Sequence, residues 1–287
     1  MILRVFIVLC SRLSSLVVYH DKTTDNIENF DNEAMRQGRD LEEYVAQRFT
    51  EETGLKVRRS NKMYWSETYP FMYADVDRLV VGEDAGLECK TVNPYGADKW
   101  KDGAIPKHYL IQCFHYMIVT GKRTWYIAAV ILGQEIVYRK IEWDEALAEY
   151  LIAIESDFWE NHIAVSRMPD PDGSESCSEV LEEYFGKNYK TDEVSLSAAM
   201  AAKLDRRREI MTEMRNLDRE KTQLEQEVKV FLDNHEVASN ERYRVSWKLV
   251  TSDRLNTKLL KTEQPEIYKK YLQNGQSSRF TVKELCG

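Results

Sequence analysis

Two carboxylates and a lysine lie close together in a stretch whose pattern predicts two paired strands. Asp77 begins one apolar run, and Glu88 and Lys90 lie in the next. The Gly-containing segment 82–86 between the runs is typical of a β-hairpin loop. Side chains two residues apart share a strand face, so Glu88 and Lys90 point the same way and Asp77 can lie across from Glu88.

These residue types in this arrangement predict a site that cuts phosphodiesters. Two carboxylates this close repel each other unless a divalent cation lies between them, and hard oxygen ligands favour Mg²⁺ or Mn²⁺. The Lys90 ammonium can steady a metal-bound water or the charge that develops at phosphorus. Because the motif is short, a solvated strand face with an ordinary Glu–Lys pair is the competing interpretation.

A helix is predicted upstream of the hairpin. Within the stretch 38–49, helical spacing relates Leu41, Tyr44, Val45, Arg48 and Phe49, and Gly54 provides a C-terminal stop. Glu42 lies beside this apolar stripe, where it could reach a cleft. The alternative is that Glu42 is a surface residue of a charged helix.

A second helix is predicted downstream, opened by Pro106 and closed by Gly121. Gln112, His115 and Tyr116 share one side of it. A glutamine can hold a water or a phosphate oxygen without changing the charge of the site. The alternative is that the helix packs its aromatic residues into the core, with Gln112 at the rim.

The order of these motifs resembles the PD-(D/E)XK nuclease fold and, more narrowly, the YqaJ-type phage recombinases related to lambda exonuclease. The similarity covers roughly residues 14–162, and its blocks are 72–79, 86–91, 105–112 and 115–121. The resemblance implies an α/β (α+β) fold with a central mixed sheet flanked by helices. A long helix and a small β appendage would follow this core.

The resemblance also implies a role for each candidate residue. The ligands of the catalytic metal, Mg²⁺ or Mn²⁺, would be Asp77, Glu88 and the main-chain carbonyl of Cys89. Glu42 would support this site or a second metal. Lys90 would activate or orient the attacking water, and Gln112 would position that water or the scissile phosphate.

The activity that the resemblance implies is trimming of linear double-stranded DNA from its 5′ ends. This leaves a 3′ overhang for a single-strand annealing protein in phage-type recombination. Related exonucleases form ring-shaped homo-oligomers. The motifs alone leave three alternatives open: an endonuclease, an exonuclease of the other polarity, and a non-catalytic module that binds DNA ends or a partner.

The N-terminus departs from the family pattern. Family members usually begin with a Gly- and Ser-rich segment that helps to read the 5′ phosphate, whereas this chain begins with an apolar stretch and is similar only from about Ser14. Arg12 and the lack of a small-x-small cleavage site argue against a secretory signal. The apolar run is too short to span a bilayer. We therefore expect 1–32 to be a truncated N-terminal segment.

Composition is typical of a cytoplasmic enzyme. The chain has 287 residues, 43% of them hydrophobic, which is enough for one α/β core and an appendage. Its five cysteines are scattered without a C-x-x-C pair, so neither a disulfide framework nor a zinc site is predicted.

The charge distribution bears on DNA binding. A net charge of −8 is unfavourable for an enzyme that must bind phosphates. Residues 240–283, however, carry ten Lys or Arg against four Asp or Glu, a local balance of +6. The predicted DNA-contacting residues in this segment are Arg244, Lys248, Arg254 and Arg279. A merely solvated basic face is the alternative.

The predicted domains are a nuclease core at 33–165, a linker at 166–179 and an extension at 180–287. Within the core we expect paired strands at 123–131 and 135–141 and a helix at 143–164.

The extension should contain a long helix at 195–235 and a small sheet of strands at 243–250 and 278–283. The helix has a heptad seam that basic residues interrupt at 203, 207 and 221. It is either a coiled coil or a helix packed on its own chain with snorkelling basic stems.

Overall fold

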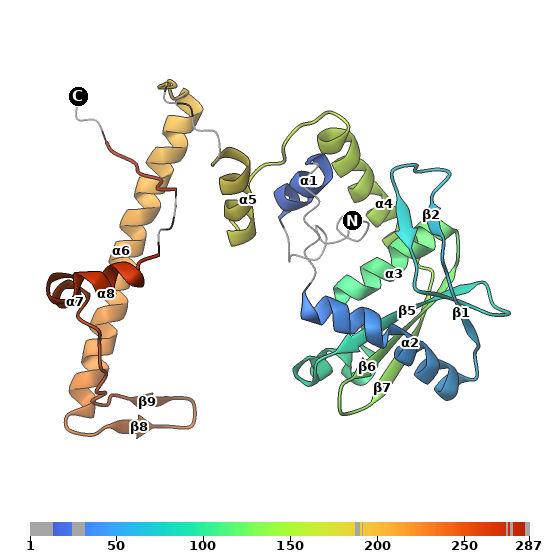
Figure 1. The fold of residues 1–287 in the computed structure, drawn as a ribbon, viewed down its shortest axis with the longest axis horizontal. Helices are drawn as coiled ribbons and strands as arrows, with labels where there is room; N and C mark the ends of the chain where they lie inside the picture. The colour runs from blue at the N-terminus through green and yellow to red at the C-terminus, as the bar shows by residue number, and fades with distance from the viewer. Residues whose placement is uncertain are drawn as a thin grey trace. The chain divides into compact units, whose positions relative to one another are not determined.

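The computed structural model describes residues 14–24, 32–186, 190, 192–273, 275 and 278–284. The chain forms two compact units, Met1–Asn188 and Tyr189–Gly287 (Figure 1). Most of the segment that sequence predicts to be truncated, residues 1–13 and 25–31, lies outside the described residues.

The first unit is built on a five-stranded mixed sheet with strand order β1-β4-β5-β6-β7. Its strands are β1 (Val57–Arg59), β4 (Arg78–Val80), β5 (Ala85–Val92), β6 (Thr124–Ile131) and β7 (Ile136–Glu142). The β5–β6 pair is parallel and the other pairs are antiparallel. This central mixed sheet flanked by helices confirms the predicted fold class.

Helices cover both faces of the sheet. α2 (Glu33–Thr53) packs Phe49 against Leu87 on one face, and α3 (Lys107–Thr120) packs Met117 against Trp125 on the other, where α4 (Glu145–Phe158) also joins the core. Fully burying a side chain of this size contributes about 1.5–3 kcal/mol, which anchors both helices to the sheet.

Successive side chains of β5 point to opposite faces of the sheet, and this alternation determines where its polar residues lie. Leu87 and Cys89 enter the core beneath α2. Glu88 and Lys90 therefore point to the opposite face of the sheet, toward α3.

The ends of the two predicted helices are where the sequence signals place them. α2 ends at Gly54 and α3 at Gly121, both with left-handed backbones at φ of 75° and 71° that glycine adopts without strain. α2 begins earlier than the apolar pattern suggests, because the Asn32 side chain accepts a hydrogen bond from the Met35 amide and caps it.

Two further short strands, β2 (Met63–Trp65) and β3 (Tyr73–Asp75), form an antiparallel ribbon between β1 and β4 in the chain. A 3₁₀ segment, η2 (Pro94–Gly103), links β5 to α3. The predicted helix at 143–164 is α4 followed by a π-helical turn, η3 (Trp159–Ile163).

The predicted linker differs from the structure. Residues 167–173 have no regular structure, but α5 (Glu175–Phe185) begins within the segment predicted as linker and belongs to the first unit. The cause is a long-range contact: Cys177 and Val180 of α5 pack against Leu16 of α1 (Ser15–Thr23). The compact units accordingly divide after Asn188 rather than within 166–179.

The second unit contains α6 (Ala198–Leu232), β8 (Val237–Ser239), β9 (Arg244–Ser246), α7 (Thr257–Glu263) and α8 (Pro265–Lys270). The long helix is confirmed, and the side chains of its heptad seam are exposed, including those of Met214, Leu217 and Phe231.

The small sheet is formed differently from the prediction. β9 pairs with β8 in a local hairpin, and no strand is assigned in the described segment 278–284. The short loop between β8 and β9 costs less entropy to close than the much longer segment between the two predicted strands, which favours the local partner. Across the described part of the chain, no helix is both long and apolar enough to cross a membrane.

Candidate active site

Asp77 and Glu88 come together through the β4–β5 pairing. Arg78 pairs with Leu87 in register, so Asp77, one residue before β4, lies across from Glu88. Asp77 Oδ2 accepts a 2.8 Å hydrogen bond from the Cys89 amide, which fixes this carboxylate against β5.

The Glu88 carboxylate is buried and only half satisfied. Its Oε1 accepts hydrogen bonds from Lys90 Nζ and, at 2.8 Å, from Gln112 Nε2. Its Oε2 has no hydrogen-bond partner among the described residues. Leaving a buried carboxylate oxygen unpaired costs free energy, so this oxygen is suited to an additional cationic ligand.

The surroundings of these groups shift their proton affinities. Burial, followed by the negative charge of Glu88, raises the pKa of Asp77 well above its ordinary value. Burial lowers the pKa of Lys90, but the charges of Glu88 and Asp77 outweigh it, so the pKa rises and Lys90 stays charged. Burial also raises the pKa of the Cys89 thiol, so this thiol stays protonated at neutral pH.

These donors fit a hard divalent cation. The described residues contain no group of three His, Cys, Asp or Glu side chains placed to hold a metal. Two carboxylates are nevertheless enough for Mg²⁺, which usually keeps several waters and binds proteins through one or two carboxylates. The unpartnered Glu88 oxygen and the repulsion between Glu88 and Asp77 favour such an ion.

Glu42 reaches the edge of the site but is bound by a residue that sequence reasoning missed. Arg78, only 3% exposed, forms an ion pair with Glu42 and donates to Glu43 Oε2 at 2.9 Å. It also donates to the Asp77 main-chain oxygen at 2.8 Å. The available signal was the arginine itself, since a charged residue inside a buried strand needs a partner.

The second predicted helix divides its polar residues between two places. Gln112 Nε2 also donates to the Tyr116 hydroxyl at 2.8 Å, so both residues lie at Glu88. His115 instead pairs with Glu155 of α4, with Nδ1 3.0 Å from Oε2, and its Nε2 lies 3.0 Å from the Tyr73 carbonyl oxygen. His115 and Glu155 therefore form a buried pair that joins α3 to α4.

A polar cleft of about 470 Å³ opens beside Asp77. It is lined by residues 59–63, residues 75–77 and Glu42. The spacing of residues 59–63 carries no motif, so these residues were not predicted to belong to a site.

The predicted DNA-contacting residues are all exposed and all lie in the second unit. They are Arg244, Lys248, Arg254 and Arg279. Lys248 is partly neutralised, with its Nζ 3.8 Å from Glu236 Oε2.

The family model of the YqaJ-like viral recombinase domain matches residues 7–123. The YqaJ protein of Bacillus subtilis (strain 168) is 33% identical over 256 residues, which cover 88% of this chain and 80% of that protein.

Among solved structures, the alkaline exonuclease LHK-Exo from Laribacter hongkongensis is 20% identical, with a TM-score of 0.43, over 55% of this chain and 92% of that one. A phage-related exonuclease from Haemophilus somnus 129PT is 15% identical, with a TM-score of 0.41, over 53% of this chain and 81% of that one.

Proposed function

Because the chain belongs to the YqaJ-like viral recombinase family, we propose that it is a metal-dependent deoxyribonuclease that degrades linear double-stranded DNA from its ends. Degradation proceeds 5′→3′ and leaves 3′ overhangs for a single-strand annealing protein. The family supports the nuclease class, and the resemblance described for the sequence motifs supports the polarity and the partner.

The observation that carries this proposal is the unpartnered Oε2 of the buried Glu88. It belongs to a carboxylate that lies across from Asp77, whose pKa is raised by burial and by the charge of Glu88. Asp77, Glu88 and the Cys89 carbonyl would hold Mg²⁺ or Mn²⁺. When bound, the ion would act as a Lewis acid on the phosphate and lower the pKa of a coordinated water.

Lys90 acts as a charged donor in this proposal. Its raised pKa makes it a poor base at neutral pH, so it orients the attacking water or stabilises negative charge on the phosphate. The Lys90 ammonium lies 4.8 Å from the centroid of the Tyr109 ring, which restrains it as a second contact besides Glu88.

Gln112 and Glu42 act on the site through other residues. The Gln112 amide nitrogen is committed to Glu88 and Tyr116, so its role is to orient the Glu88 carboxylate. Glu42 is committed to Arg78, which holds the main chain at Asp77. Both are therefore positioning residues in this proposal.

A homo-oligomer, in the form of a ring around the product strand, belongs to the proposal because it would keep the enzyme on its substrate. The exposed heptad seam of α6 is a surface through which copies of the chain could also associate. Residues 240–283 would bind DNA or the annealing protein.

The test uses linear duplexes labelled at the 5′ or the 3′ end and a covalently closed circle, each with Mg²⁺. The proposal predicts early release of the 5′ label, later loss of the 3′ label and an intact circle. Glu88→Gln is the control, because it keeps the side-chain volume and removes the charge that holds the ion. Rapid nicking of the circle would indicate an endonuclease, and early 3′ release would reverse the polarity.

A further inference from the structure

We propose that the cleft beside Asp77 binds the single DNA strand that flanks the scissile phosphate, with Arg59 and Lys62 on its phosphates and Trp65 on its bases. This inference rests on the proposed nuclease function. It assigns a role to the loop between β1 and β2 and to the exposed face of the β2–β3 ribbon.

The register of β1 points Arg59 into the cleft. Arg59 pairs with Arg78, so the two side chains share the sheet face on which Arg78 binds Glu42. Arg58 pairs with Leu79 and points to the opposite face. The two adjacent arginines therefore differ in whether they point to the Glu42 side of the sheet, and of the two only Arg59 lines the cleft.

The cleft offers a positive charge to an entering strand. Among the described residues, the side chains of Arg59 and Lys62 have no hydrogen bond or ion pair. Of the three carboxylates in the cleft, Glu42 is neutralised by Arg78, and Asp77 would be neutralised by a metal. Asp75 alone opposes the two free cations, so the cleft should attract phosphate groups.

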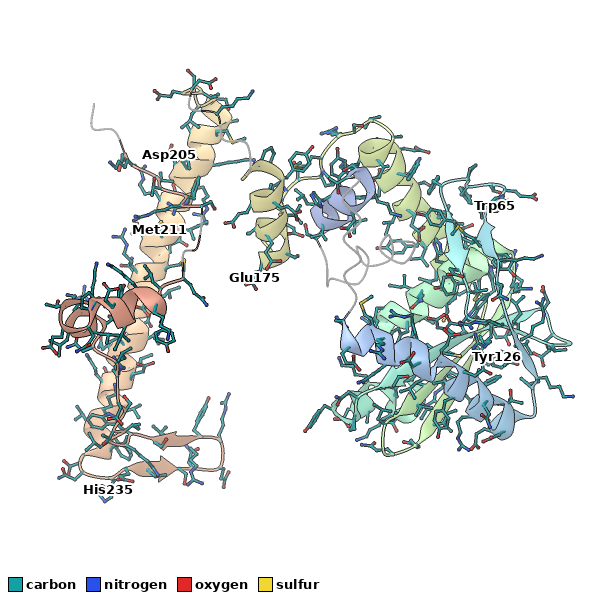
Figure 2. The ribbon with its side chains drawn as sticks, in the orientation of Figure 1. Trp65, Tyr126, Glu175, Asp205, Met211 and His235 are labelled. Atoms are coloured by element: carbon teal, nitrogen blue, oxygen red, sulfur yellow. The ribbon has the colours of Figure 1, made fainter. Side chains whose placement is uncertain are left out.

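The β2–β3 ribbon extends this surface with apolar side chains. Met63 lines the cleft, and Trp65, two residues further, lies on the same face of β2. The Tyr64 side chain points the other way and packs against the core. Trp65 is 67% exposed, and Figure 2 shows it at the outer edge of the first unit.

This combination fits a single strand better than a duplex. An aromatic side chain on a sheet can stack on a base only where the base is not covered by its neighbours, as in an unpaired strand. Phosphate-binding cations interleaved with a stacking aromatic are the usual means of holding such a strand without reading its sequence. Because Asp77 lines the same cleft, a strand bound there reaches the site of cleavage.

The test is binding of the full chain, with Ca²⁺ in place of Mg²⁺ as the hard divalent cation, to a fluorescent single-stranded oligonucleotide of roughly ten nucleotides, within the range that such sites cover. The double variant Arg59→Ala/Lys62→Ala should weaken binding at least tenfold. It should also reduce the slope of log affinity against log salt by about 1.4, because two phosphate contacts are lost. Trp65→Ala should weaken binding about tenfold without changing the slope.

Two matched variants complete the experiment. Arg58→Ala removes the same charge from the other face of β1 and should change affinity less than twofold. Asp75→Asn removes the opposing carboxylate and should strengthen binding. The proposal is overturned if the double variant binds no more weakly than Arg58→Ala, or if it binds more weakly with an unchanged salt slope.

Cleavage measurements separate this inference from the proposed function. The double variant should raise KM for short substrates and leave kcat near the wild-type value, because it removes binding that is equal in the ground and transition states. If the wild type cleaves DNA but the variants show no change in affinity or KM, only the strand cleft is wrong. If the wild type cleaves no DNA, the proposed function fails whatever the binding data show.

Discussion

Gln112 Nε2 lies 2.8 Å from Glu88 Oε1, which joins α3 to β5 inside the first unit. Lys90 donates to the same oxygen. An amide and an ammonium thus hold one oxygen of the carboxylate, while Oε2 is left without a partner. The arrangement sets the orientation of Glu88 before any ion binds.

Replacing Gln112 should therefore weaken the site without removing a ligand. Gln112→Ala is expected to reduce the apparent affinity for Mg²⁺, or the cleavage rate, by about 10–100-fold, the usual effect of losing a partner that orients a metal ligand. Tyr116→Phe removes only the second acceptor of the same amide and should have a smaller effect. A Mg²⁺ titration of the cleavage rate tests this, and a wild-type midpoint together with a wild-type maximal rate in Gln112→Ala would contradict it.

The raised pKa of Asp77 predicts a pH-dependent stability in the absence of metal. Burial and the charge of Glu88 make the folded chain hold the Asp77 proton to a higher pH than the unfolded chain does. This contribution is fully present below the ordinary pKa of 3.8 and is lost as pH rises through the folded value. Asp77→Asn avoids the loss, so its Tm should exceed that of the metal-free wild type at neutral pH.

Addition of metal should reverse that difference. Mn²⁺ should raise the Tm of the wild type, because an ion that binds only the folded state stabilises it. It should have little effect on Asp77→Asn, which lacks one ligand charge. Thermal unfolding with EDTA and with Mn²⁺ at several pH values measures both effects. Equal Mn²⁺ shifts in the two proteins would exclude Asp77 as a ligand.

Lys90 should matter for rate rather than for metal binding. Lys90→Met keeps the length of the side chain and removes the charge, so we expect the single-turnover rate to fall by about 10²–10³-fold, the effect of removing one electrostatic donor. The thermal shift with Mn²⁺ should persist, because the proposed ligands are intact. Loss of that thermal shift would mean that Lys90 also contributes to binding of the ion.

Arg78 should be a determinant of stability, because it is buried and binds carboxylates from α2. Removing one partner of a fully buried ion pair costs about 3–5 kcal/mol. Glu42 is 19% exposed and Glu43 is 79% exposed, so we expect about 2 kcal/mol for Arg78→Ala. Glu43→Gln is the matched control and should change stability by less than about 0.5 kcal/mol. Urea unfolding measures both changes.

The contrast between Lys90 and Arg78 shows how much of the site was predictable. The pairing of Asp77 with Glu88 and the shared face of Glu88 and Lys90 follow from strand periodicity and a local hairpin. The partner of Arg78 lies on a helix more than thirty residues earlier, and no periodic pattern encodes that contact. Local geometry was accessible from the sequence, whereas the roles of Glu42 and Gln112 depend on long-range partners.

The same distinction holds for the fold. The two helices that end in glycine and the long helix α6 have strong local signals, whereas the mixed sheet was expected from the family resemblance. The packing of α5 on α1 and the β8–β9 pairing have no such signal. The position of α5 depends on an apolar surface offered by a distant segment, and β9 pairs with β8 because the loop between them is short. The linker and the C-terminal sheet were therefore the elements where sequence and structure differ.

Removal of the second unit should affect binding more than chemistry. A chain that ends at Asp192 keeps every proposed catalytic residue and loses the basic segment 240–283. It should still hydrolyse short duplexes at high enzyme concentration, with a lower apparent affinity for DNA. The salt dependence should also be shallower, because each lost phosphate contact lowers the slope for duplex DNA by about 0.9.

Point variants of the full chain decide whether the basic residues themselves are responsible. Replacing Arg244, Lys248, Arg254 and Arg279 by Ala should reproduce the shallower salt slope if they contact phosphates. If the segment docks the annealing protein instead, the slope will stay at the wild-type value and truncation will abolish co-purification of the two proteins. The truncated chain could be folded, as measured by circular dichroism, and still fail to cleave short duplexes. In that case the second unit would be part of the catalytic machinery, and the division between chemistry and binding would be wrong.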